Sequence, residues 1–310
     1  MTIPVADGHC DYLYYMLHRD YSMENPVRTQ AVSLPAMEAG GAALQLFAAW
    51  IDPDERTSAL QQCLCMIDGY HRLLKNTPAF VPFSPEFEPG CGKIAALLTI
   101  EGGEAIEGRL ENLRMFYALG VRAMSLTWNA SNELASPAMS RRDKGLTTLG
   151  RTVVREMERL NMAVDVAHLS DAGIDGVLDA TCAPIFSSHT NARSVCRHRR
   201  SLSDRHIKEI ASRGGVVCVN YFSPQLVQNG RATVSDVARH VAHIARVAGP
   251  EHVALGSDFD GMGQEAYPEG LSSWRGVPLL LEALTRVGFH EKEVRAIAYD
   301  NLAGYFKRFV

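Results

Sequence analysis

Histidines and acidic residues stand directly behind several short apolar runs of this chain. His9 and Asp11 follow the first run, Glu101 ends the third, and His168 and His189 follow two later ones. Imidazole and carboxylate are ligands that zinc and similar ions prefer, and one carboxylate can bridge two ions. His9 and Asp11 lie two residues apart on an extended segment, so their side chains point the same way. If the runs end on one face of the protein, this set predicts a two-metal centre for hydrolysis.

A further carboxylate, Asp258, follows the last apolar run. Taken singly, a histidine at the end of a strand is more often a hydrogen-bonded structural residue than a metal ligand. The metal interpretation therefore depends on the joint arrangement, in which the first, third, fifth, sixth and eighth runs all end in candidate groups.

Eight apolar runs are expected to form the strands that position these groups. Most are continuous rather than alternating, as is typical of strands buried on both faces. Amphipathic stretches with helical spacing lie between them, and Ser170, Ser203 and Thr233 are suitable N-cap residues. The expected strands are Pro4–Asp7, Ala43–Trp50, Ala95–Ile100, Val121–Thr127, Met162–Ala167, Ala183–Ser187, Val216–Asn220 and His252–Gly256. The expected helices are Thr57–Lys75, Gly108–Leu119, Thr148–Leu160, Ser170–Ala180, Ser203–Arg213, Thr233–Val247, Val277–Val287 and His290–Phe309.

Strands that alternate with helices eight times predict an α/β fold, a (β/α)8 TIM-type barrel, as a single domain over residues 1–310. A length of 310 residues would also allow two domains, but no linker or change in composition divides the chain. In such a barrel the C-terminal ends of the strands meet at one mouth, where active sites are built. Two long segments, Asn76–Gly92 and Asn129–Leu146, are expected to be functional loops inserted over that mouth.

The composition is that of an ordinary soluble globular protein. Hydrophobic residues make up 46% and charged residues 21%, and 31 basic against 35 acidic residues give a formal net charge of −4. This balance argues against disorder and against nucleic-acid binding through bulk positive charge. We expect no membrane association, because the apolar stretches are too short to span a bilayer and no secretory signal precedes His9. The seven cysteines, an odd number, suit small apolar side chains in a reduced, cytoplasmic setting.

Several longer motifs occur in order along almost the whole chain. They are Asp7-Gly-His-Cys-Asp11, Ile100-Glu-Gly-Gly103, Gly120-Val-Arg-Ala-Met-Ser-Leu-Thr127, Gly145-Leu-Thr-Thr-Leu-Gly150, Asp165-Val-Ala-His-Leu-Ser170, Ala183-Pro-Ile-Phe-Ser-Ser-His189, Ser194-Val-Cys196, Arg199-Arg200 and Ser257-Asp-Phe-Asp-Gly261. In these motifs the sequence resembles the membrane (renal) dipeptidases, peptidase family M19 of the metal-dependent amidohydrolase superfamily.

The resemblance implies a binuclear zinc barrel that hydrolyses small dipeptides, including those with D-residues, by a metal-bridged hydroxide. Carried over residue by residue, His9 and Asp11 would hold one zinc ion and His168 and His189 the other. Glu101 would bridge the two ions and so belongs to the catalytic set.

Two further residues gain a role from the resemblance. Arg200 would bind the substrate carboxylate, for which a guanidinium is well shaped. Asp258 would contact the substrate amine and transfer the proton to the leaving group. Without the resemblance, Arg200 would be interpreted as part of a solvated basic loop over residues 193–200. The resemblance also suggests a homodimer.

The sequence departs from the family pattern at two positions. Trp128 stands where the family commonly has a histidine that contacts the substrate, and an indole donates one hydrogen bond but accepts none. The neighbouring Asn129 is a candidate to take over part of that contact. Glu104 stands where Glu-Gly-Gly is usually followed by histidine. The expected metal ligands are intact, so the departures concern the substrate.

Two other functions stay open at this point. A related binuclear amidohydrolase could act on N-acyl amino acids, lactams or another small amide, and a catalytically silent barrel could serve as a binding protein. Other motifs are weaker: Cys63-x-Cys65 is expected to be core packing, since residues two apart on a helix do not share a face. His240 and His243 do share a helical face, but on an outer helix, where we expect no metal.

Overall fold

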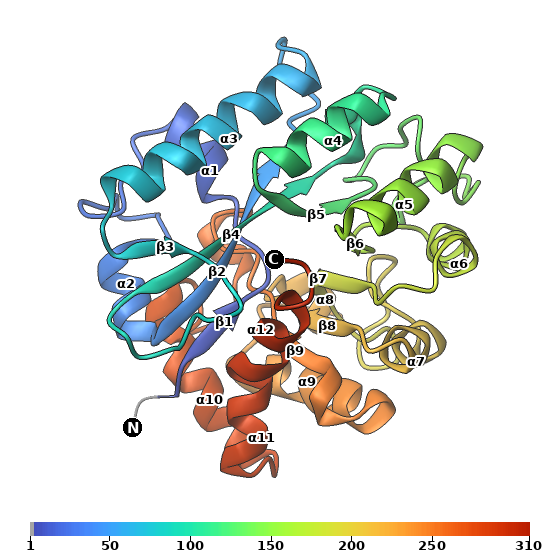
Figure 1. The fold of residues 1–310 in the computed structure, drawn as a ribbon. Helices are drawn as coiled ribbons and strands as arrows, with labels where there is room; N and C mark the ends of the chain where they lie inside the picture. Colours follow the sequence, from blue (N-terminus) through green and yellow to red (C-terminus); the bar gives the residue numbers. More distant parts are fainter. Residues whose placement is uncertain (1–2) are drawn as a thin grey trace.

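Eight parallel strands form a nearly closed barrel in this computed structural model, which describes residues 3–310 (Figure 1). Each strand pairs with its neighbours in the ring, and the first and last barrel strands pair with each other, which closes it. The prediction of a (β/α)8 barrel is therefore confirmed. The barrel strands are β1 Val5–Asp7, β2 Ala42–Trp50, β4 Ile94–Glu101, β5 Val121–Ser125, β6 Ala163–Asp165, β7 Phe186–Thr190, β8 Val216–Val219 and β9 Val253–Leu255.

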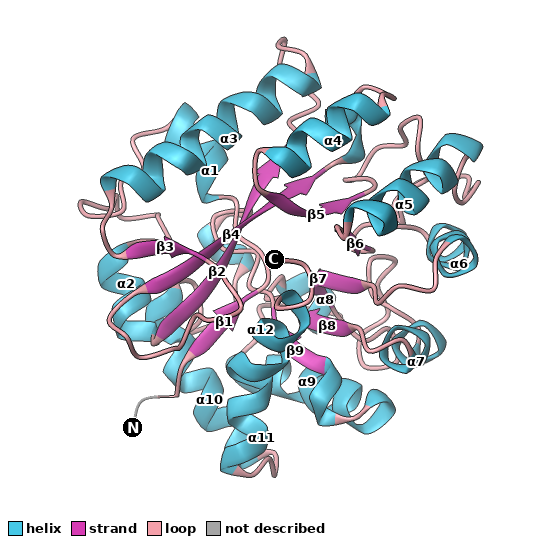
Figure 2. Ribbon diagram, viewed as in Figure 1, coloured by secondary structure: helices cyan, strands magenta, loops and turns pink. Residues whose placement is uncertain are grey.

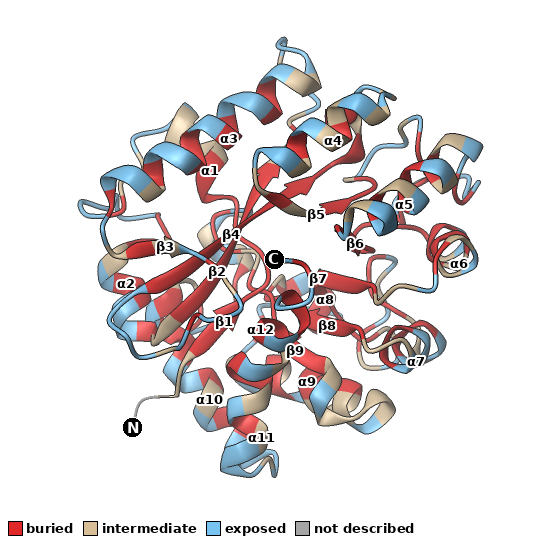
Figure 3. Cartoon of the chain, in the orientation of Figure 1, coloured by how far each residue is buried: buried red, intermediate tan, exposed pale blue. Residues whose placement is uncertain are grey.

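The main helices surround the barrel and turn their exposed faces outward (Figures 2 and 3). The hydroxyls of Ser170 and Ser203 accept hydrogen bonds from the backbone of the first helical turn, and Thr233 forms a capping box with Asp236, as their sequence positions predict. These helices are α3 Ala59–Asn76, α4 Leu110–Ala118, α5 Thr148–Leu160, α6 Asp171–Ala180, α7 Asp204–Ser212, α9 Val234–Ala248 and α10 Val277–Arg286.

The sequence led us to expect a loop over the barrel mouth at Asn76–Gly92. The segment instead leads into the N-terminal end of β4, opposite the mouth, and it is not wholly a loop. A short strand, β3 Phe80–Pro82, lies within it and pairs in parallel with Ile94–Ala96 at the start of β4. The prolines of the segment masked this strand, but Pro82 stands at its end, where a missing N–H is tolerated. The other long segment, Asn129–Leu146, contains no helix or strand and lies as a loop after β5.

The C-terminal helix is interrupted where the sequence predicts one continuous element. It consists of α11 Glu291–Arg295, a π-helical turn over Ala296–Asp300, and α12 Asn301–Phe306. In α12, Tyr305 and Phe306 pack on Phe186, the first residue of β7, with ring centroids 5.3 and 5.1 Å apart. The helix therefore covers the N-terminal ends of the strands, which leaves the opposite end of the barrel for a site.

Three short helices lie in loops that the sequence analysis left without structure. They are α1 Tyr12–His18, α2 Leu34–Gly40 and α8 Ser223–Leu226, each too short to show a helical hydrophobic period. Both α1 and α8 follow barrel strands and so stand at the mouth. No helix in the described part of the chain is both long enough and apolar enough to cross a membrane.

Candidate metal centre

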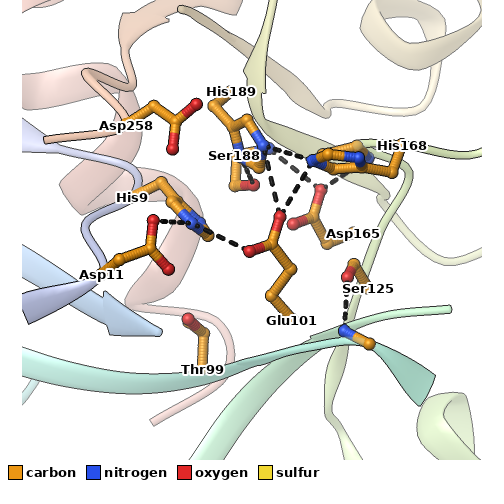
Figure 4. Close-up of polar contacts among 12 residues, drawn as sticks. His9, Asp11, Thr99, Glu101, Ser125, Asp165, His168, Ser188, His189 and Asp258 are labelled. Carbon is orange, nitrogen blue, oxygen red and sulfur yellow. Dashed lines mark hydrogen bonds and ion pairs between the residues drawn. The ribbon is translucent and has the colours of Figure 1, made fainter. Parts of the chain in front are cut away.

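The expected ligands meet at the mouth because each follows or ends a barrel strand. His9 lies two residues beyond β1, Glu101 is the last residue of β4, His168 lies three residues beyond β6, and His189 belongs to β7. All of these side chains are buried, and so is Asp11, which precedes α1. Figure 4 shows that they point toward one another from their separate strands.

Glu101 lies at the centre of this cluster. Its Oε1 is 2.9 Å from Nε2 of His168 and 3.4 Å from Nε2 of His189, and its Oε2 is 3.4 Å from Nε2 of His9. A carboxylate that reaches three histidines with both oxygens has the position of a bridging ligand. Asp11 completes the set, with Oδ2 3.6 Å from Nε2 of His9.

Neighbouring side chains fix the orientation of two imidazole rings. Nδ1 of His168 donates a hydrogen bond to Oδ1 of Asn129 at 3.0 Å, and Nδ1 of His189 lies 2.8 Å from the hydroxyl of Ser188. Burial lowers the pKa of His168 to about 4, so this ring is neutral. Arg200 donates from Nη2 to Nε2 of His189 at 3.0 Å, which leaves the lone pair of His189 on Nε2 as well.

The chemistry of these atoms fits a cation. The Nε2 lone pairs of His168 and His189 face each other at 2.9 Å and also face a carboxylate oxygen of Glu101. Arg200 donates to Nε2 of His189, but the lone pair of His168 and the carboxylate of Glu101 still face each other at 2.9 Å, an arrangement that a cation between them stabilises. Zinc ligands at about 2.0–2.1 Å in a tetrahedron stand about 3.3 Å apart, which is close to the observed separations.

Two orphaned atoms support the same conclusion. Nε2 of His9 and Oδ1 of Asp11 are buried and have no hydrogen-bond partner among residues 3–310. Ligand atoms within 4.8 Å of one another form two groups, one of His9, Glu101 and His189 and one of His9, Asp11 and Asp258. The residues present therefore fit divalent metal at this mouth, and Asp258 stands close enough to take part.

Asp258 is held in an unusual backbone conformation. Its φ is 60° and that of His168 is 67°, in the left-handed region that residues other than glycine rarely adopt. Such strain persists where surrounding structure enforces it, often at functional sites. Nδ2 of Asn220 donates to Oδ2 of Asp258 at 3.1 Å. Burial, together with the negative charges of Asp11 and Glu101, raises the pKa of Asp258 to about 7.

A cavity of about 430 Å³ lies over the cluster. Trp50 and Trp128 form an aromatic wall on the side of β2 and β5, with ring centroids 5.1 Å apart. Arg200 and Gln225 line the side of β7 and β8, and Asp258 lies next to them beyond β9. Arg200 is 7% exposed, so it is not part of a solvated loop, and burial lowers its pKa to about 10, at which it is still charged at neutral pH.

The sequence model of the membrane dipeptidase family, peptidase family M19, matches residues 1–308. The chain belongs to this family of metallopeptidases. It is 33% identical to Dipeptidase 3 of Rattus norvegicus over 98% of this chain, which spans 65% of the rat protein, and 32% identical to an uncharacterized dipeptidase of Schizosaccharomyces pombe over 98% of this chain and 80% of that protein. A metallopeptidase structure from Rhodobacter sphaeroides, liganded with a phosphinate mimic of the dipeptide L-Ala-D-Ala, matches with a TM-score of 0.91 and 26% identity over 100% of both chains.

The two residues that depart from the membrane dipeptidase family pattern, Trp128 and Glu104, have different surroundings. Trp128 lines the cavity, with its ring centroid 6.3 Å from that of His168. Asn129 also lines the cavity and accepts the hydrogen bond from His168. Glu104 accepts a hydrogen bond from Nδ2 of Asn132 at 2.7 Å and so ties the loop after β5 to the end of β4.

Several residues around the centre were not predicted from the sequence. Asp7 accepts hydrogen bonds from the backbone and hydroxyl of Ser257 at 2.6 and 2.7 Å, and Asp165 accepts from the backbone of Ser188 at 3.0 Å. Both carboxylates fix the loops that carry ligands. They stand within motifs of the membrane dipeptidase family, which was the available signal. Gln225 has no comparable signal in the sequence.

Replacing His168 by alanine is expected to remove bound metal and to lower activity by at least about a hundredfold, because the ring is aimed at Glu101. His243 provides the matched control. It lies on α9, where its Nε2 is 2.8 Å from Oδ1 of Asp204. We expect His243→Ala to leave metal content and activity unchanged. Metal analysis and initial rates check both variants. Metal loss in the His243 variant would contradict the assignment of the metal to the cluster around Glu101.

Proposed function

We propose that this protein is a zinc-dependent dipeptidase that hydrolyses small dipeptides, including those with a D-residue. The observation that carries the proposal is the bridging position of Glu101 among three histidines, at the floor of a cavity of about 430 Å³. Two relatives are named dipeptidases, and the Rhodobacter sphaeroides neighbour holds a mimic of L-Ala-D-Ala, which supports the substrate class.

The cavity is lined by charges of both signs, which suit the two ends of a free dipeptide. Arg200 offers a buried guanidinium to the carboxylate, because its only hydrogen bond from the side chain within residues 3–310 goes to His189. Asp11, Glu101 and Asp258 form an acidic group that suits a free amine. A site with a charge for each terminus accepts a dipeptide and excludes the interior of a longer chain.

The proposed chemistry divides between the metal and the side chains. Two zinc ions, held by His9 and Asp11 and by His168 and His189 with Glu101 between them, would supply Lewis acidity and a water of lowered pKa. Asp258 takes the proton of the attacking water and delivers it to the leaving amine, with Asn220 holding its carboxylate in place. Asn129 keeps His168 turned toward the centre, and the wall of Trp50 and Trp128 keeps bulk water away from the reacting bond.

A rate comparison on three small substrates tests this proposal. The zinc-loaded protein should cleave L-Ala-L-Ala and L-Ala-D-Ala and should act on N-acetyl-L-alanine at least about a hundredfold more slowly in kcat/KM, because the last compound lacks the free amine. The alternative function is hydrolysis of N-acyl amino acids, and the feature that favours it is the aromatic wall of Trp50 and Trp128. Cleavage of N-acetyl-L-alanine with no cleavage of either dipeptide would replace the dipeptidase assignment by an N-acyl amidohydrolase.

The cellular setting is also a proposal. All seven cysteines are free, and Cys65, Cys91 and Cys182 are exposed. Free exposed thiols favour a reducing compartment, so we propose the cytoplasm. The homodimer remains a prediction from the family resemblance.

A further inference from the structure

Gln225 is a buried polar side chain whose oxygen has no partner in the part of the chain that the structure describes. It belongs to the short helix α8 beyond β8, is 3% exposed and lines the cavity over the metal centre. Its Oε1 has no hydrogen-bond partner among residues 3–310. Burying an unpaired amide oxygen costs free energy, so such a group calls for an explanation.

The other buried glutamines of the described chain are satisfied. Gln30 bonds both its amide nitrogen and its oxygen to the backbone around Ser22 and Val32. Gln45 donates to Asp7 and accepts from Trp274, and Gln62 has three backbone partners. Among the buried glutamines, only Gln225 thus has an unpaired oxygen in the described chain, and it lines the active-site cavity. Asn191 also has an unpaired side-chain oxygen, but it does not line this cavity.

The order of the strands in the barrel indicates which part of a substrate would contact Gln225. β8 stands between β7 and β9 in the ring, so Gln225 is a neighbour of Arg200 in the wall that follows β7. The aromatic wall of Trp50 and Trp128 lies beyond β2 and β5, across the mouth. A dipeptide whose carboxylate is bound by Arg200 would therefore bring its C-terminal residue next to the wall that contains Gln225.

We propose that Gln225 is a specificity-determining residue that hydrogen-bonds the side chain of the C-terminal residue of the dipeptide. A carboxamide both accepts and donates, so the favoured partners are side chains with a hydroxyl or a carboxamide: serine, threonine, asparagine and glutamine. A dipeptide with an isosteric apolar residue leaves Gln225 unpaired and is selected against. This inference rests on the proposed dipeptidase function and adds the substrate class to it.

Isosteric substrate pairs test the proposal on the zinc-loaded protein. The ratio of kcat/KM for Ala-Thr to Ala-Val, and for Ala-Asn to Ala-Leu, is expected to be about tenfold in the wild-type protein. In Gln225→Leu both ratios should fall to about one, with the rate on Ala-Val kept or raised. Gln228→Leu is the matched control, because Gln228 bonds Cys196 and Arg197 outside the cavity, and it should keep the wild-type ratios.

Thermal unfolding of the metal-loaded variants separates a substrate role from a structural one. Because Gln225 has an unpaired oxygen, Gln225→Leu should unfold at the wild-type Tm or above it, and Gln225→Met should do the same. A fall in Tm of both variants would overturn the proposal in favour of a structural role. Wild-type ratios near one, or ratios unchanged in Gln225→Leu, would overturn it while the dipeptidase function stands. Failure of the wild-type protein to cleave any of the four dipeptides would refute both.

Discussion

Glu101→Gln is expected to lower kcat by roughly a thousandfold or more and to reduce the bound metal from about two ions per chain. The carboxylate of Glu101 reaches three histidines with its two oxygens, which no other carboxylate in the described chain does. The substitution keeps the shape of the side chain, and its amide can donate to the lone pair on Nε2 of His168. The metal-free variant should therefore unfold at a Tm no lower than that of the metal-free wild type.

Glu104→Gln is the matched control for this experiment. Glu104 lies three residues away and bonds Asn132, but it does not line the cavity. We expect it to bind metal and cleave dipeptides as the wild type does. Metal analysis, initial rates and thermal unfolding should be measured for both variants. An active Glu101→Gln protein with full metal content would show that Glu101 is not a bridging ligand.

Asp258→Asn should separate proton transfer from metal binding. The asparagine keeps the size of the side chain but cannot carry a proton between water and amine, so kcat should fall by about 10²–10⁴-fold with the metal content unchanged. Asp258 is also within 4.8 Å of His9 and Asp11, in a group that could hold an ion. A variant that loses one metal together with its activity would make Asp258 a ligand and would contradict its role in proton transfer.

The barrel was predictable from the sequence because its strands are buried on both faces. Continuous apolar runs alternate with amphipathic helices, and the candidate ligands stand at the strand ends, where the topology brings them together. The departures have physical causes. The strand Phe80–Pro82 is three residues long and is paired only at the start of β4, and the π-helical turn at Ala296–Asp300 leaves the apolar pattern of its helix intact.

The sequence predicted which candidate ligands would meet at the mouth, but it did not predict the walls of the cavity. His9, Asp11, Glu101, His168 and His189 have residue types that signal metal binding. The hydrogen bond from His168 to Asn129 and the unpaired oxygen of Gln225 depend on side-chain geometry across different strands, which has no periodic signal. Trp50 ends its strand as an ordinary aromatic residue, and only its contact with Trp128 identifies it as part of the cavity wall.

Zinc titration of the chelated protein tests the two-metal account most directly. After treatment with a chelator the protein should be inactive on L-Ala-L-Ala, and activity should rise with added zinc and level off at about two equivalents per chain. A plateau at two equivalents is the result that the cluster around Glu101 predicts. Full activity in the chelated protein, or folded protein that binds no zinc, would contradict it.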